Sequence, residues 1–244
     1  MNKNIFLIVY IILLSNTPSQ RLDNANSSPM KILGEINPTK EGTKYDDVFN
    51  ADWIKDLKLT LPCDGLNIPK RASRLPNAPR DYRNGIHKGI DFFANWGTEV
   101  KAVAKGYIVR ADKYYEEYPP DFREQMLVSS DRAGHTPSDI FNSVLLGKAI
   151  IIDHGFDLIP NFRTISIYAH LSSIDENISP GSKVSAGQII GKTGNSGTKQ
   201  STLGTRKESH LHWELILQKD NNEIYLGKNM EYDKLYPMLS NIFN

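Results

Sequence analysis

The stretch His-Leu-His-Trp-Glu-Leu-Ile-Leu-Gln, residues 210–218, decides the fold. Every second position from Leu211 to Leu217 is hydrophobic, which is the alternation of a β-strand with one buried face. His210 and His212 then project from the opposite face, roughly 6.6 Å apart along the strand. The stretch therefore predicts a strand that carries two histidines above a hydrophobic core.

The chain around this strand predicts a mainly β domain of antiparallel strands. Turn signals at 153–155 and 180–181 separate short hydrophobic runs, as expected for an antiparallel sheet. An earlier strand is predicted over 57–61, and residues 69–85 are expected to form an ordered loop. The other predicted strands cover residues 100–111, 148–153, 164–170, 188–192 and 211–218.

Residues 112–147 interrupt the strands and predict a partly helical insertion. The sequence 136–139 offers a helix N-cap with Pro137 at the first helical position, and hydrophobic residues follow at helical spacing. Residues 120–127 predict another helical turn. We therefore expect the insertion to join two strands of the β domain.

The N-terminal part of the chain predicts export. Lys3 precedes an apolar run over 5–14, and small polar residues follow, the order that is typical of a secretory signal. Residues 1–19 are thus a signal peptide or, alternatively, an uncleaved anchor, and membrane contact is expected only there. Residues 20–52 are polar and predict a linker or prosegment before a domain over 53–244. We expect a periplasmic, cell-envelope or extracellular protein.

The composition limits the classes of binding partner and the residue types that could bind a metal. The net charge of +1 favours neither nucleic acid nor an anionic membrane surface as a partner. The single cysteine, Cys63, can form neither an internal disulfide nor a thiolate zinc site. Any metal must rest on His, Asp or Glu, and we expect a monomer.

Four of the six histidines and one aspartate fall in three short motifs, 87–91, 168–171 and 210–212. In a straight strand His87 and Asp91 would lie roughly 13 Å apart, so the chain must bend between them, and Gly89 permits a bend. His170 is expected on the polar face of its strand, together with Ser166 and Tyr168. A catalytic zinc needs three N/O ligands and nearby groups that move protons, which these motifs can supply.

The two remaining histidines are predicted to lie away from such a site. His154 falls in a predicted turn that closes a strand, and His135 falls in the insertion. A nucleotide site at 187–193 is excluded, because a P-loop needs four residues between its glycines and a helix after its lysine.

On these motifs the chain resembles the lysostaphin-like, or LytM-type, zinc metallopeptidases. The resemblance covers about residues 61–217 and includes supporting phrases at 89–92, 97–100, 152–155 and 187–197. It implies a duplicated-hybrid-motif-like LytM-type peptidase fold. It also implies one zinc ion bound by His87, Asp91 and His212, with His170 and His210 as the catalytic histidines, since the family uses the second histidine of His-x-His as a ligand.

The same resemblance implies a function. The chain would be an exported zinc metalloendopeptidase that hydrolyses peptide bonds in peptidoglycan stems or cross-bridges with a zinc-activated water. The bond cleaved and the division of roles between His170 and His210 stay open. The alternative is a non-enzymatic LytM-fold regulator or binder of cell-wall hydrolases, although all five site positions are retained.

The chain also departs from compact members of this family. The insertion at 112–147 and the stretch 197–209 are both extended. We expect both to shape the rim of the cleft, and the insertion or the segment before Asp52 to cover part of it.

Overall fold

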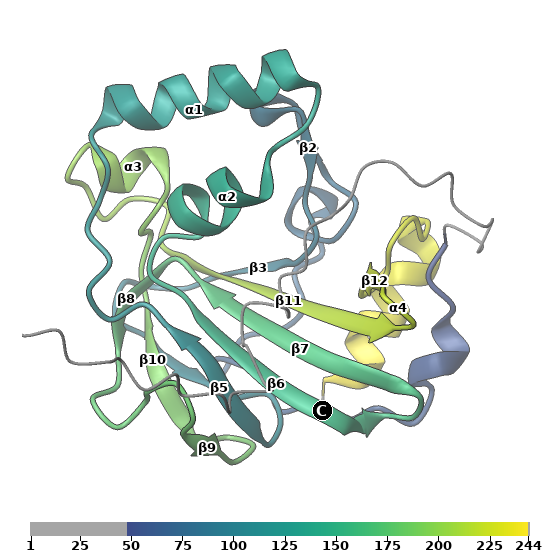
Figure 1. Ribbon diagram of the computed structural model, residues 1–244. Coiled ribbons are helices and arrows are strands. Elements are labelled where there is room, and N and C mark those ends of the chain that lie inside the picture. The colour runs from purple at the N-terminus through teal and green to yellow at the C-terminus, as the bar shows by residue number, and fades with distance from the viewer. Residues whose placement is uncertain (1–47, 244) are drawn as a thin grey trace, which may run out of the picture. The chain divides into compact units, whose positions relative to one another are not determined.

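The computed structural model describes residues 48–243, and these form antiparallel strands with few helices (Figure 1). The predicted mainly β class is therefore confirmed. The largest sheet has seven strands in the order β12-β11-β7-β6-β5-β9, with β3 paired to β11. Its strands are β3 (Ile90–Phe93), β5 (Gly106–Ala111), β6 (Ile150–Ile159), β7 (Phe162–Ala169), β9 (Lys183–Val184), β11 (His210–Lys219) and β12 (Asn222–Tyr225).

Two smaller sheets complete the β structure. One has the order β4-β10-β8, and the other is a hairpin of β1 and β2. Their bounds are β4 (Glu99–Lys101), β10 (Ile189–Thr193), β8 (Leu171–Ile174), β1 (Pro79–Arg80) and β2 (Gly85–Ile86). The β1–β2 hairpin begins within residues 69–85, where the sequence predicts only a loop, and ends at Ile86.

One hydrophobic core joins the seven-stranded and three-stranded sheets. Trp213 and Tyr168 are its largest fully buried side chains, and Val100 and Ile190 contribute from the smaller sheet. The predicted polar face of β7 is wrong, because Tyr168 lies in this core and its hydroxyl accepts a hydrogen bond from the Val103 N–H at 2.9 Å. Both faces of β7 are buried, so alternation could not tell them apart.

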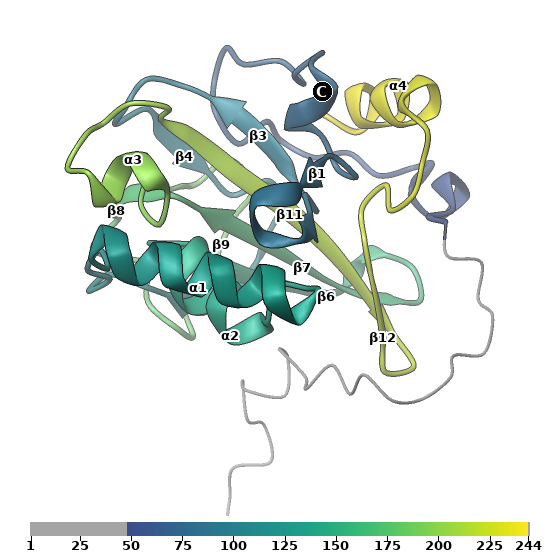
Figure 2. The ribbon, with the colours of Figure 1, turned by 90° about the horizontal axis from the view of Figure 1, so that it is seen from above.

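The insertion is partly helical, as predicted. It contains α1 (Pro120–Ala133), α2 (Ser138–Ile140) and a π-helical turn, η5 (Phe141–Leu145). The helix α2 begins after Pro137, close to the predicted start, whereas α1 is longer than the turn predicted over 120–127. Figures 1 and 2 show α1 lying over α2, above one end of the large sheet.

The remaining helices of the described residues lie outside the insertion. They are η2 (Ala51–Ile54), η3 (Ala72–Arg74), η4 (Asp81–Arg83), α3 (Lys199–Thr202) and α4 (Tyr232–Ile242). The helix α4 was not predicted from the sequence, although its buried side chains Leu235, Leu239 and Ile242 recur at helical spacing. None of the helices within residues 48–243 is long and apolar enough to cross a bilayer.

Two strand predictions and one turn prediction are corrected by the structure. The strand predicted over 57–61 is wrong: Leu59 makes only an isolated bridge to Phe243, and its N–H donates to the Ile242 carbonyl. The strand predicted over 100–111 is two strands, β4 and β5, that belong to different sheets. The predicted turn at 153–155 is a register shift inside β6, where Gly155 has a φ of 63°.

The predicted signal segment and most of the predicted linker lie outside the described residues. Phe49 is buried in the core, and its N–H donates to the Lys228 carbonyl at 2.8 Å. The packed part of the chain thus includes residues just before Trp53, where the predicted domain begins.

Candidate metal centre

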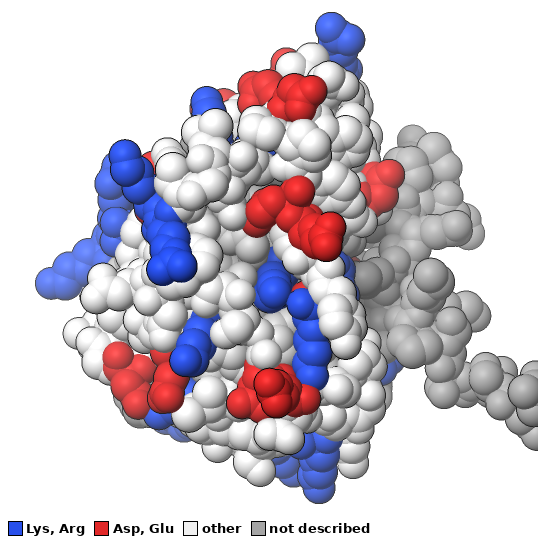
Figure 3. Space-filling view, turned by 90° about the vertical axis from the view of Figure 1, so that its left-hand side faces the viewer, with Lys and Arg blue, Asp and Glu red and all other residues white. Residues whose placement is uncertain are grey.

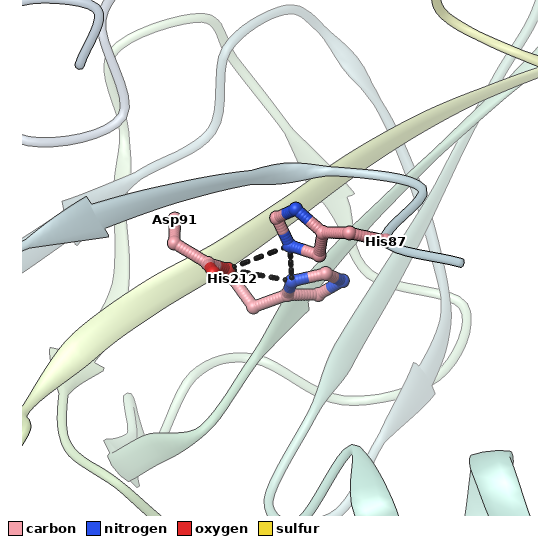
Figure 4. Close-up of side chains that lie close together, drawn as sticks. All are labelled: His87, Asp91 and His212. Atoms are coloured by element: carbon pink, nitrogen blue, oxygen red, sulfur yellow. Dashed lines mark hydrogen bonds and ion pairs between the residues drawn. The ribbon is translucent and has the colours of Figure 1, made fainter. Parts of the chain in front are cut away.

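Three polar atoms converge on one buried point between β3 and β11. Nε2 of His87 lies 2.9 Å from Oδ1 of Asp91 and 3.0 Å from Nδ1 of His212. Nδ1 of His212 lies 2.9 Å from the same Asp91 oxygen. Figure 4 shows the three side chains pointing toward one another. They form a group that could hold a metal ion, and all three residues are buried.

Strand pairing brings these residues together. Asp91 of β3 is directly opposite His212 of β11 in the antiparallel register. The chain bends after β2 and enters β3 at Ile90, which returns His87 toward Asp91 and confirms the predicted bend.

Gly89 is needed for a different reason from the one expected. It is not among the described residues with positive φ, so the bend itself does not demand a glycine. A Cβ atom at this position would lie only 2.4 Å from the Trp213 carbonyl oxygen and 3.0 Å from Cε1 of His212. The glycine therefore permits the close approach of the two chain segments that carry the site.

A second set of contacts orients the three side chains. The Nδ1–H of His87 donates to the Leu75 carbonyl at 2.9 Å, and the Nε2–H of His212 donates to Oε1 of Glu214 at 2.7 Å. Arg80 donates to the outer oxygen of Asp91 at 3.1 Å. Each imidazole thus directs its other nitrogen to the common point, as metal-binding histidines do.

Leu75, Arg80 and Glu214 were not predicted from the sequence. A signal for Glu214 was present, since it follows His210 and His212 at the same two-residue spacing and must share their strand face. Leu75 and Arg80 contribute from a turn and a hairpin, and nothing in their local pattern indicates contact with the histidines.

Charge stabilises this centre. Burial raises the pKa of Asp91, but hydrogen bonds from His212 and His87 outweigh burial and hold it well below its usual value. Burial lowers the pKa of His212, but the hydrogen bonds to Asp91 and Glu214 raise it to about 9. Burial lowers the pKa of His87. The carboxylates of Asp91 and Glu214 thus favour a positive charge at this centre, which is the proton of His212 here and would be the metal ion once bound.

His170 and His210 flank the centre. The ring centroid of His170 lies 4.8 Å from that of His210 and 5.7 Å from that of His212. The predicted strand over 164–170 ends one residue early, and His170 has a φ of 61°, so it leaves the sheet at the end of β7. Nε2 of His210 lies 3.9 Å from Oδ1 of Asp91.

The two flanking histidines have the same hydrogen-bond pattern. The Nδ1–H of His170 donates to the Ser196 carbonyl at 2.8 Å, and that of His210 donates to the Glu208 carbonyl at 2.7 Å. Burial lowers the pKa of His210 and holds that of His170 well below its usual value. Both rings are therefore neutral near pH 7 and keep an unprotonated Nε2. The ring of His210 also stacks on Phe93, with centroids 4.9 Å apart.

The other two histidines are elsewhere, as predicted. His154 is buried and bonds to the Lys105 carbonyl and the Ser166 hydroxyl. His135 is in the insertion and bonds only to the Ala133 carbonyl among the described residues. Neither lines the cleft at the candidate centre.

The centre opens into a cleft of about 420 Å³. The insertion and the stretch that begins at Gly197 both line it, which confirms the prediction that these extended segments shape its rim. The residues of the insertion in the cleft wall are Arg123, Glu124, Leu127, Phe141, Leu145 and Leu146. Figure 3, which faces the side that carries α3, shows basic side chains recessed in a hollow with acidic side chains on its rim.

The end of the insertion touches the loop that holds His170. A Cβ atom on Gly147 would lie 2.3 Å from the Ser196 carbonyl oxygen, and one on Gly197 would lie 2.6 Å from the Gly147 nitrogen. Both glycines also have positive φ. The two backbones are thus in direct contact beside the cleft.

An antiparallel β domain with this cleft and these three motifs is the arrangement of a LytM/lysostaphin-type peptidase domain. The model of peptidase family M23 matches residues 85–224, and the chain belongs to this family. A comparison with curated proteins gives no match.

Several solved structures are similar to the chain. A zinc-containing peptidase from Vibrio cholerae is 19% identical, over 57% of this chain and 29% of that chain, with a TM-score of 0.35. A putative peptidase M23 from Pseudomonas aeruginosa is 23% identical, over 71% and 54%, with a TM-score of 0.35. The catalytic domain of the antimicrobial peptidase lysostaphin from Staphylococcus simulans is 24% identical, over 70% and 90%, with a TM-score of 0.33. The chain spans less than a third of the length of the Vibrio cholerae peptidase.

Proposed function

We propose that this M23 peptidase is an exported zinc endopeptidase that hydrolyses peptide bonds in peptidoglycan stems or cross-bridges. The observation that carries the proposal is the convergence of Nε2 of His87, Oδ1 of Asp91 and Nδ1 of His212 within 3.0 Å of one another in a cleft. Family membership supports the peptidase chemistry. The peptidoglycan substrate and the export rest on the family resemblance and on the character of residues 1–19.

The donor set fits zinc. Two imidazole nitrogens and one carboxylate oxygen are the ligands of a catalytic zinc that keeps a position open for water. The hydrogen bonds to Leu75 and Glu214 fix the tautomers that ligation requires. When bound, zinc would lower the pKa of a water molecule and polarise the carbonyl of the scissile bond.

His170 and His210 would move the protons. Each is neutral and presents an unprotonated Nε2, because its Nδ1–H is committed to a backbone carbonyl. Such a nitrogen can accept a proton from the attacking water and return it to the leaving amine, or donate a hydrogen bond to the oxyanion once protonated. We propose that the two histidines share these tasks.

The proposal is tested with the zinc-loaded protein and defined muropeptides. We expect peptide products whose masses identify the bond cleaved, and none with the His210→Ala variant. Failure of the zinc-loaded protein to cleave any muropeptide would reject the enzymatic function. The non-enzymatic alternative is not favoured, since the five side chains line an open cleft.

A further inference from the structure

Arg123 is a buried residue whose side chain is only partly used by the protein. It lies in the first turn of α1, is 8% exposed and lines the cleft. Its Nε–H donates to the Gly197 carbonyl at 3.0 Å. Among the described residues, neither terminal nitrogen of this guanidinium has a hydrogen-bond partner or a carboxylate at ion-pair distance.

Neither of the neighbouring carboxylates, Glu117 and Glu124, forms an ion pair with Arg123 in the described part of the chain. Glu117 instead accepts hydrogen bonds from the Gly197 N–H at 3.0 Å and from the Ser201 hydroxyl at 2.6 Å. Glu124 is exposed on the next position of α1 and makes no ion pair within the described part of the chain. Burial lowers the pKa of Arg123 more than the neighbouring groups, Glu124 and Glu117 among them, raise it, which reflects the cost of burying this charge.

A second buried arginine lines the same cleft. Arg83 in η4 is 7% exposed, and η4 packs against α1. Its guanidinium donates to the Thr136 hydroxyl at 2.9 Å and to the Ile86 carbonyl at 3.0 Å, both neutral groups. Two buried positive charges thus border the insertion side of the cleft without a carboxylate partner among the described residues.

A planar guanidinium with free terminal nitrogens matches a carboxylate in two parallel hydrogen bonds. We propose that Arg123 binds a carboxylate of the peptide substrate and that Arg83 adds its charge. The cleft would therefore select peptides that carry a free carboxylate near the scissile bond. This proposal rests on the proposed function, because it concerns the substrate of the same cleft.

The anchoring of Arg123 sets the position of that carboxylate. The bond from its Nε to Gly197 fixes the guanidinium beside Ser196, whose carbonyl orients His170. A carboxylate held by the terminal nitrogens would thus be fixed relative to the proton-moving groups. Such fixing aligns the neighbouring peptide bond and lowers the cost of reaching the transition state.

Binding measurements on the full, zinc-loaded protein test the proposal. The probe is a synthetic stem tetrapeptide of L-Ala, D-Glu, a diamino acid and D-Ala, compared with versions in which either the C-terminal or the D-Glu carboxylate is an amide. We expect the unaltered protein to bind one of the two amidated peptides about tenfold or more weakly than it binds the peptide with both carboxylates free. That difference should disappear in Arg123→Gln. It should shrink in Arg123→Lys, which keeps the charge but cannot form two parallel hydrogen bonds to a carboxylate.

Arg132→Gln is the matched control, since it removes the same charge from an exposed position of the same helix. It should bind all three peptides as the unaltered protein does. Equal binding of acid and amide peptides by the unaltered protein would overturn the proposal. So would an Arg123→Gln variant that weakens all three peptides equally, because that result indicates a role only in holding Gly197.

Turnover of the same peptides separates this proposal from the proposed function. In Arg123→Gln, KM for the acid peptide should rise, and KM for the amide peptide should stay unchanged. If the unaltered protein cleaves neither these peptides nor any of the defined muropeptides, the enzymatic function fails. The binding comparison still decides whether Arg123 recognises a carboxylate.

Discussion

Nε2 of His212 lies 2.7 Å from Oε1 of Glu214, and both side chains are buried on one face of β11. The bond fixes the imidazole so that Nδ1 points to His87 and Asp91. A carboxylate behind a metal-binding imidazole also makes that imidazole a stronger ligand. Burial raises the pKa of Glu214, but the hydrogen bond from His212 outweighs burial and keeps the carboxyl ionised.

Replacing Glu214 with Gln should therefore weaken zinc binding about 10- to 100-fold. The amide can still accept the hydrogen bond, but it removes the negative charge that strengthens the ligand. Competition with a chromogenic chelator measures the affinity. Glu116→Gln, at an exposed position, should leave it unchanged; equal affinity in the two variants would contradict a role for Glu214.

The histidines of the His-x-His motif should separate into two functions. His212→Ala should lose both zinc and hydrolysis, whereas His210→Ala should lose hydrolysis and largely keep zinc. The physical reason is that only His212 contributes an atom to the converging group. Metal content and muropeptide turnover, measured on the same preparations, check this prediction, and equal zinc loss in both variants would refute it.

Gly89→Ala should destabilise the fold by about 1–3 kcal/mol and weaken zinc binding, because the new Cβ would collide with the Trp213 carbonyl and the His212 ring. Urea denaturation and chelator competition measure the two effects. Gly65→Ala is the comparison, since Gly65 has a φ of 71° but open space around it. That variant should lose some stability and no zinc affinity; if Gly89→Ala binds zinc normally, the close approach is not what the site needs.

The Asp153–Arg163 ion pair should make the free energy of unfolding depend on pH in the acidic range. Burial raises the pKa of Asp153, but bonds from Arg163 and the Gly155 N–H outweigh it and lower the pKa below the usual 3.8. The ion pair therefore stabilises the fold above about pH 4, and this stability is lost as the pH falls through the depressed value.

Asp153→Asn should accordingly cost about 1 kcal/mol at pH 7 and progressively less toward pH 2, as followed by urea denaturation. Asp157 is in the same strand as Asp153 and forms an exposed ion pair with Lys105. Asp157→Asn should change the free energy of unfolding little at either pH. A pH-independent loss in Asp153→Asn would indicate that its packing, and not its charge, matters.

The sequence predicted the fold class, and it predicted motifs whose residues the structure brings together, where a local pattern reflects the three-dimensional contact. The alternation in 210–218 identifies β11, and the spacing from His87 to Asp91 requires the bend that the structure contains. Both features depend on residues that are neighbours along the chain, so the sequence expresses them directly.

The predictions that failed depend on contacts that are distant in the sequence. Leu57 and Leu59 alternate like a strand, yet Leu59 pairs with the end of α4 at the other terminus. Tyr168 has a polar group but is buried because Val103, in another segment, satisfies its hydroxyl. Arg80 was missed for the same reason, since only the β1–β2 hairpin places it on Asp91.

The contact between Gly147 and Gly197 links the insertion to the backbone loop that holds His170. The insertion lines the cleft, and its last residue rests on the loop that holds His170. An insertion borrowed from a relative would need the same backbone crossing to leave His170 in place. We therefore expect that exchanging the insertion would disturb the position of His170 as well as the wall of the cleft.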